Sequence, residues 1–191
     1  RGASGSRDVG GEAAAAYDWD ALAQSMLTIS EETEGYALVL GLGSGRLAEA
    51  VVRHSQLHVV AVDPDSETVD AFRRRMDSLG WYGTRAAALA CDPAGMELPP
   101  YFARLATSED RSMFASPATG NEGHPQAEST DEPLPASPAT ARSASITTVF
   151  RRLRPYGGVA LLPASEKSVR SRIEENEPGT LHGARITSAG P

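Results

Sequence analysis

Residues 36–64 read YALVLGLGSGRLAEAVVRHSQLHVVAVDP: an apolar run, a cluster of glycines, a helical segment, a second apolar run and an acid. This order predicts a strand that turns sharply into a helix and returns as a second strand, as in nucleotide-binding β-α-β units. Gly41, Gly43 and Gly45 allow the tight turn and let the backbone approach a ligand closely. Asp63 ends the second strand, where a carboxylate can accept hydrogen bonds from both hydroxyls of a ribose.

The rest of the chain continues this alternation of strands and helices. The predicted strands are 36–40, 57–62, 84–90, 101–106 and 159–162, and the predicted helices are 12–27, 46–54, 65–79, 146–153 and 165–175. The alternation predicts an α/β fold with a doubly wound, mostly parallel, Rossmann-like sheet and right-handed crossovers. A further strand begins only near 181–187, so we expect the sheet to be incomplete at its C-terminus. Ligand is expected at the carboxyl ends of the strands.

The helix over 65–79 has the most regular apolar stripe in the chain. Its N-cap is expected at Asp65 or Ser66, and Gly80 is a natural C-cap. Three consecutive arginines, 73–75, lie within it. We expect them to form a solvated face of the helix rather than a nucleic-acid contact.

Composition divides the chain into one ordered domain with two irregular segments. Residues 1–11 are rich in glycine and serine and are expected to be flexible. Residues 115–145 contain many prolines, serines and alanines and predict a disordered insert, because they cannot bury enough apolar surface. Residues 12–114 and 146–191 then form a single Rossmann-like domain. Apolar residues spaced by three and four in the first predicted helix should pack on the sheet edge or help to cover the ligand cleft.

Charge and cysteine content exclude several classes of function. The formal net charge of −7 disfavours binding to nucleic acid or to an anionic membrane, which requires clustered Lys and Arg. A single cysteine, Cys91, excludes an internal disulfide and a cysteine-rich zinc site, and the four histidines have no metal-ligand spacing. No apolar run approaches the ~18 residues of a membrane-spanning helix. The sequence begins at Arg1 rather than Met, which suggests a fragment or a processed chain.

The glycine cluster alone leaves the nucleotide open. The run from Gly43 to Ala48 satisfies the G-x-G-x-x-A pattern of dinucleotide sites, and Asp63 follows Gly43 by twenty residues. An NAD-dependent oxidoreductase is therefore one interpretation. It predicts binding of a nicotinamide cofactor and no response to S-adenosylhomocysteine.

Other features favour a different cofactor. The glycine run is followed by Asp63 after the second strand, Asp92 after the third and LRPYGG (153–158) before the fifth. This order resembles the class I S-adenosylmethionine-dependent methyltransferases over about residues 36–163. The resemblance implies S-adenosyl-L-methionine as the cofactor and methyl transfer as the reaction. It implies that the glycine turn wraps the cofactor's methionine part and ribose, that Asp63 takes the ribose hydroxyls, and that Asp92 accepts from the adenine amino group, with Cys91 beside the ring.

The sequence also departs from that family. An acidic residue usually stands two positions before the first glycine, near the cofactor's ammonium group, and here that position is Val39. We therefore expect weak cofactor binding and little turnover by this chain. No catalytic residue is assigned by the sequence; Glu109 and Asp110, after the fourth strand, are the candidates for a general base. The methyl acceptor is not identified.

A narrower resemblance comes from the segments LHVVAVDPD, LGWYGTR and LRPYGGVALLPAS. They look like methyltransferase-like domains that precede a quinoprotein-type β-propeller in large bacterial proteins. This implies a non-catalytic ligand-binding or scaffold domain of a larger protein as a further alternative. The sequence assigns no compartment, although a free-standing methyltransferase would be cytoplasmic.

Overall fold

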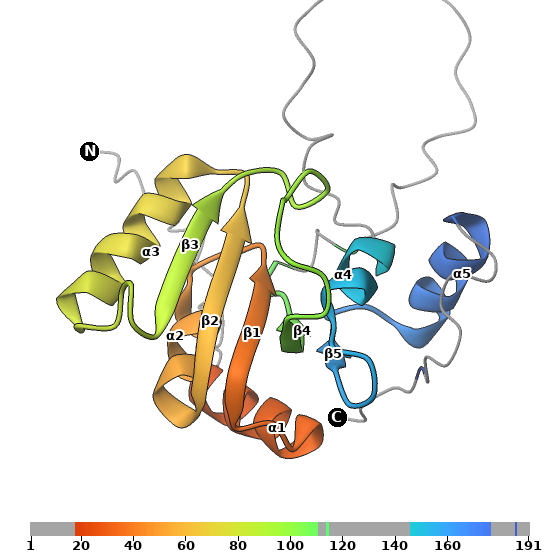
Figure 1. The fold of residues 1–191 in the computed structure, drawn as a ribbon, viewed down its shortest axis with the longest axis horizontal. Helices are drawn as coiled ribbons and strands as arrows, with labels where there is room; N and C mark the ends of the chain where they lie inside the picture. Colours follow the sequence, from red (N-terminus) through yellow and green to blue (C-terminus); the bar gives the residue numbers. More distant parts are fainter. Residues whose placement is uncertain (1–17, 111–113, 115–145, 177–185, 187–191) are drawn as a thin grey trace, which may run out of the picture.

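The computed structural model describes residues 18–110, 114, 146–176 and 186 (Figure 1). The segments predicted to be flexible or disordered, 1–11 and 115–145, lie outside these residues. So does the strand predicted near 181–187, apart from Ile186, which belongs to no strand.

Five parallel strands form one sheet. They are β1 (Glu34–Leu40), β2 (Gln56–Asp63), β3 (Ala86–Ala90), β4 (Ala103–Thr107) and β5 (Val159–Leu161). Their spatial order is β3-β2-β1-β4-β5, so the strand order reverses between β1 and β4. This confirms the predicted doubly wound parallel sheet. In sheets of this kind, ligands bind at the carboxyl edge beside such a reversal.

Alternating residues of the central strands build two separate cores. One face contributes Ala37 and Val39 of β1, which pack with α2 (Arg46–His54) and α3 (Ser66–Ser78) in one buried cluster. The other face contributes Leu38 and Leu40, which belong to a second buried cluster. The uninterrupted apolar run that predicted a strand buried on both faces is therefore explained.

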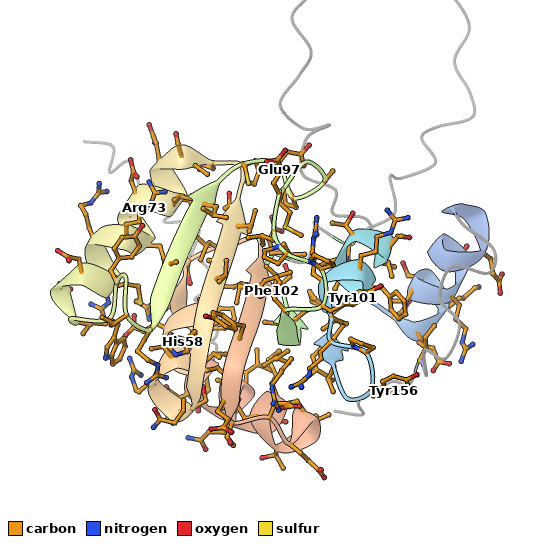
Figure 2. The ribbon with its side chains drawn as sticks, viewed as in Figure 1. His58, Arg73, Glu97, Tyr101, Phe102 and Tyr156 are labelled. Atoms are coloured by element: carbon orange, nitrogen blue, oxygen red, sulfur yellow. The ribbon has the colours of Figure 1, made fainter. Side chains whose placement is uncertain are left out.

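Helices cover the two faces unequally. In the view of Figure 1, α1 (Trp19–Ser30), α2 and α3 lie behind or beside β1 to β3, whereas α4 (Ile146–Arg152) and α5 (Glu166–Asn176) lie near β4 and β5. The connection from β3 to β4, residues 91–102, contains no helix. Figure 2 shows His58 and Phe102 on the face of the sheet that α1, α2 and α3 do not cover. The ring centroid of Tyr36 lies 5.5 Å from that of His58 and 5.9 Å from that of Phe102.

Local hydrogen bonds explain where the helices begin and end. Asp65 is the N-cap of α3, and its carboxylate accepts from the Glu67 N–H at 3.0 Å. The C-cap is Leu79, and Gly80 follows it at φ +71°, the left-handed conformation that favours glycine after a helix. Helix α1 begins after its N-cap Asp18, a residue that was predicted to lie within the helix, and it runs three residues beyond the predicted end. Residues 12–17 of the predicted helix lie outside the described residues.

The apolar side of α1 packs on the sheet and also on a neighbouring helix. The helix lies mainly against α2, and the sulfur of the buried Met26 lies 4.0 Å from the Thr107 hydroxyl of β4, with Trp19 and Leu22 half-buried against the same core. The contact with the sheet agrees with the prediction, whereas the larger contact with α2 was not predicted. The stripe specifies that this side is buried, but not which element buries it.

Two strands begin two residues later than predicted. Residues 81–85 form a hydrogen-bonded turn, in which the Arg85 N–H donates to the Trp81 carbonyl at 2.8 Å, so β3 begins at Ala86. Tyr101 has φ 61° and donates its N–H to the Arg151 carbonyl rather than to a neighbouring strand. The strand β4 therefore begins at Ala103. No helix among the described residues is long and apolar enough to cross a membrane.

Candidate functional site

The glycine turn joins β1 to α2 at the carboxyl edge of the sheet. Gly41, Gly43 and Gly45 have φ values of +76°, +55° and +74°, a region that side chains strain to reach. The Gly41 N–H donates to the Val62 carbonyl at 2.8 Å, which ties the turn to the end of β2. Gly43 and Ser44 are exposed at the tip of the turn.

Gly45 also has a packing role. A Cβ at this position would lie 2.9 Å from Cδ2 of Phe72, a buried residue of α3. The missing side chain therefore lets α3 pack against the start of α2. This glycine would be required even if the turn bound nothing.

Asp63 is placed directly behind the glycine turn. It is 8% exposed, its Oδ2 accepts from the Leu42 N–H at 2.8 Å, and its Oδ1 accepts from the Asp65 N–H at 2.9 Å. The carboxylate thus holds the turn and the connection after β2 in one geometry. A carboxylate has about four lone-pair sites, so each oxygen retains acceptor capacity for a further donor.

The end of β3 brings Cys91 and Asp92 to the same edge. The Cys91 N–H donates to the Asp63 carbonyl at 3.1 Å, and the exposed Asp92 carboxylate accepts from the Ala94 N–H at 2.9 Å. Burial raises the pKa of the half-buried Cys91 thiol, and the charge of Asp92 raises it further. The thiol is therefore a poor nucleophile near neutral pH.

Arg152 of α4 holds the connection that follows Asp92. Its Nη2 donates to the Met96 carbonyl at 2.9 Å, and its Nη1 donates to the Leu98 carbonyl. Met96 is buried and belongs to the second core cluster. The helix-free segment 91–102 is thereby fixed to α4, with Glu97 exposed in it (Figure 2).

Glu109, just after β4, reaches across to the glycine turn. Its Oε1 accepts from the Ser44 N–H at 2.8 Å and from the Ser44 hydroxyl, and its Oε2 accepts from the Leu47 N–H at 3.2 Å. Its own N–H donates to the Gly41 carbonyl at 3.3 Å. Glu109 therefore acts as the side-chain cap of α2, whose N-cap, Gly45, has no side chain to do so.

Sequence reasoning did not predict this cap. It placed Glu109 and Asp110 together as candidate bases, but it gave no partner for either. Glu109 is 65 residues away from Ser44, so no local pattern joins them. The available indication was a helix whose N-cap position is a glycine, which has no side chain to cap it. Asp110 is half-buried, and its carbonyl accepts from the Ser108 hydroxyl at 2.9 Å.

Val39 points into the core behind the turn. It is fully buried in the cluster that also contains Leu42 and Leu47. A carboxylate at this position would require a buried partner. Among the described residues, no group of three or more His, Cys, Asp or Glu side chains is arranged to hold a metal ion.

Solved structures are similar to this chain over most of its length. One is a protein from Methanococcus maripaludis whose assignment as an S-adenosyl-L-methionine-dependent methyltransferase is itself provisional: TM-score 0.56 and 16% identity, covering 83% of this chain and 64% of that chain. Another is the [4+2]-cyclase SpnF: TM-score 0.53 and 16% identity, covering 75% of this chain and 43% of that chain. No protein-family model matches the sequence, and no curated protein matches it.

These similarities, at 16% identity, establish the fold alone, a mostly parallel Rossmann-like α/β sheet. The chain spans less than two thirds of the length of either protein. Because one is described as a methyltransferase and the other as a cyclase, the shared fold does not by itself define the reaction.

Proposed function

We propose that this chain is the cofactor-binding domain of a class I S-adenosylmethionine-dependent methyltransferase, acting on an acceptor that the chain does not identify. The observation that carries the proposal is the buried Asp63 carboxylate, fixed at the end of β2 by the Leu42 N–H of the glycine turn. A carboxylate held there, beside the reversal of strand order, is suited to accept the hydroxyls of a ribose.

The residues at the carboxyl edge fit this cofactor. Asp63 retains acceptor capacity on both oxygens, and Gly43 exposes backbone without a side chain. Asp92 is exposed and can accept from the adenine amino group, with Cys91 beside it in the chain. The glycine turn would take the ribose and the methionine part.

When bound, S-adenosylmethionine supplies an activated methyl group, so the protein needs no nucleophile of its own. The work of the chain is then to bind, orient and exclude water, which are the main sources of rate in a proximity-driven transfer. Glu109 and Asp110 are the candidates for accepting a proton from the methyl acceptor. In the described arrangement both oxygens of Glu109 already accept hydrogen bonds from the glycine turn.

Binding is expected to be weak. The buried Val39 provides no carboxylate for the cofactor's ammonium group. A missing charge-assisted hydrogen bond costs ~1.5–3 kcal/mol of binding free energy if nothing replaces it.

Isothermal titration of the chain with S-adenosylhomocysteine and, separately, with NAD tests the proposal. Saturable binding of S-adenosylhomocysteine without binding of NAD is expected. Binding of NAD alone would favour the oxidoreductase interpretation.

Binding of neither ligand would favour a scaffold domain. The similarity to a cyclase is the observation that keeps functions other than methyl transfer open. A β-propeller partner also stays a proposal, which the reading frame beyond Pro191 tests directly.

A further inference from the structure

We propose that Glu109 is an internal competitor for the cofactor: its carboxylate occupies the N-terminus of α2, where the anionic end of the cofactor's amino-acid group would bind. This inference rests on the proposed function and concerns the regulation of that same site. The site is then closed by the chain's own residue, and ligand binding requires Glu109 to leave the glycine turn.

The contacts of Glu109 are those expected of a bound carboxylate ligand. One oxygen accepts from the Ser44 N–H and hydroxyl, and the other accepts from the Leu47 N–H at 3.2 Å. The Leu47 N–H belongs to the first turn of the nine-residue helix α2, whose dipole also favours a negative charge, and the Ser44 N–H belongs to the glycine turn just before it. Glu109 thus satisfies donors that an incoming anion would otherwise use.

The lack of a side chain on Gly43 makes this contact possible. A Cβ on Gly43 would lie 3.2 Å from Cγ and Cδ of Glu109, so the carboxylate rests directly on the turn. Two carboxylates cannot share these donors, because like charges at this separation repel and each donor carries one hydrogen. A ligand carboxylate and the Glu109 carboxylate therefore exclude one another.

The attachment of Glu109 allows its side chain to move while its backbone stays. The Glu109 N–H donates to the Gly41 carbonyl at 3.3 Å, and the preceding residues, Thr107 and Ser108, are buried. The side chain itself is only half-buried. Rotation of that side chain would expose the Ser44 and Leu47 N–H groups without unfolding β4.

The experiment compares two ligands across a series of variants. S-adenosylhomocysteine carries the amino-acid group, and 5′-methylthioadenosine keeps the adenosine and thioether but lacks that group. We expect Glu109→Ala to bind S-adenosylhomocysteine about 3- to 30-fold more tightly than the wild type, the range set by typical capping contributions. The affinity of Glu109→Gln for S-adenosylhomocysteine should lie between those of Glu109→Ala and the wild type, because its amide still offers one acceptor oxygen. Affinity for 5′-methylthioadenosine should not change.

Glu34→Gln, at the exposed amino end of β1, is the matched control for the change in net charge. A second measurement, amide hydrogen exchange of Ser44 and Leu47, should show faster exchange in ligand-free Glu109→Ala than in the wild type.

Unchanged affinity for S-adenosylhomocysteine in Glu109→Ala would overturn the competition while leaving the proposed function in place. Weaker affinity would also overturn it, and would instead assign Glu109 to the cofactor's ammonium group, the partner missing at Val39. Binding of S-adenosylhomocysteine by no variant, the wild type included, would overturn the proposed function and the competition together.

Discussion

At the scale of single residues, Asp63 has a structural role and a proposed binding role in the same carboxylate. Its two oxygens accept from the Leu42 and Asp65 N–H groups, which follow β1 and β2 at the same edge of the sheet. The role expected from sequence, contact with a ribose, would use the lone pairs that remain. A substitution at Asp63 therefore reports on both stability and ligand binding.

Asp63→Asn should reduce both the stability of the fold and the affinity for ligand. Whichever way the amide is turned, its nitrogen faces one of two backbone donors, which leaves that donor unpaired and costs roughly 1–3 kcal/mol of unfolding free energy. The binding free energy for S-adenosylhomocysteine should fall by a further ~2–4 kcal/mol, as two hydroxyl contacts are impaired. Denaturant unfolding and calorimetric titration of the folded variant measure the two losses.

Asp92→Asn provides the comparison, since this side chain is exposed and bonds only within its own turn in the contacts described above. Its stability should stay within ~0.5 kcal/mol of the wild type. If Asp63→Asn proved as stable as Asp92→Asn and bound S-adenosylhomocysteine as tightly as the wild type, neither role of Asp63 would hold.

At the scale of elements, the start of α2 depends on a glycine that serves packing as well as the turn. Gly45 combines φ +74° with a position where a Cβ would lie 2.9 Å from Phe72 of α3. Gly45→Ala should therefore lower the unfolding free energy by roughly 1–3 kcal/mol, from backbone strain and the clash together. Chemical denaturation of Gly45→Ala and of the wild type measures this loss of unfolding free energy.

A double variant separates these two causes. Adding Phe72→Leu to Gly45→Ala removes the clash but keeps the strained φ, so it should recover part of the loss beyond the cost of Phe72→Leu alone. Gly95→Ala is the control, because a Cβ there would make only an ordinary contact at 3.8 Å. Equal stability of Gly45→Ala and Gly95→Ala would contradict the packing argument.

The connection between β3 and β4 depends on one arginine. Arg152→Met keeps much of the apolar stem of the side chain but removes the donors to the Met96 and Leu98 carbonyls. Leaving these acceptors without a partner should cost roughly 1–3 kcal/mol of stability. Hydrogen exchange should quicken in residues 91–102 in this variant.

Arg151→Met, one position earlier on the same helix and more exposed, is the control for Arg152→Met. Uniform acceleration of exchange across the sheet, rather than in residues 91–102, would argue against a local role.

At the scale of the whole molecule, an ion-pair network joins three helices behind the sheet. Glu49 of α2 accepts from Arg75 of α3 at 3.0 Å through each of its two oxygens, and it also accepts from Arg53. Arg53 in turn donates to Asp20 of α1 at 2.8 Å. The hydrogen bond from Arg75 is the main cause that lowers the pKa of Glu49, which is buried despite its charge.

This network predicts a pH dependence of stability. Because the pKa of Glu49 in the folded protein lies below its ordinary value of 4.5, the ionised carboxylate stabilises the fold above that pH. The contribution is lost as the pH falls through the lower, folded value. Glu49→Gln should be roughly 1–3 kcal/mol less stable at neutral pH and should lose less stability on acidification.

Thermal unfolding from neutral pH to about pH 3 measures how the stability of each protein changes with pH, with Glu34→Gln as the control for the change in net charge. The wild type and Glu34→Gln should converge toward Glu49→Gln at the acidic end. Parallel curves for all three proteins would show that Glu49 does not couple the helices to pH.

The sequence alone determined the order of the elements and the position of the proposed ligand edge. Apolar runs, helical spacing and left-handed glycines are properties of a few neighbouring residues, so they predicted β1, the turn and α2 correctly. Strand alternation was enough to predict the parallel sheet, because parallel strands need crossover segments between them. The same local chemistry limited the N-cap of α3 to Asp65 or Ser66, and the structure shows that it is Asp65.

Only the tertiary structure decided which partners these elements find. The cap of α2 by Glu109 joins residues far apart in the chain, and its donors are backbone N–H groups that every residue except proline possesses. No sequence pattern can distinguish such a donor. The apolar stripe of α1 likewise specified a buried side but not α2 as its partner, because hydrophobic burial is non-directional.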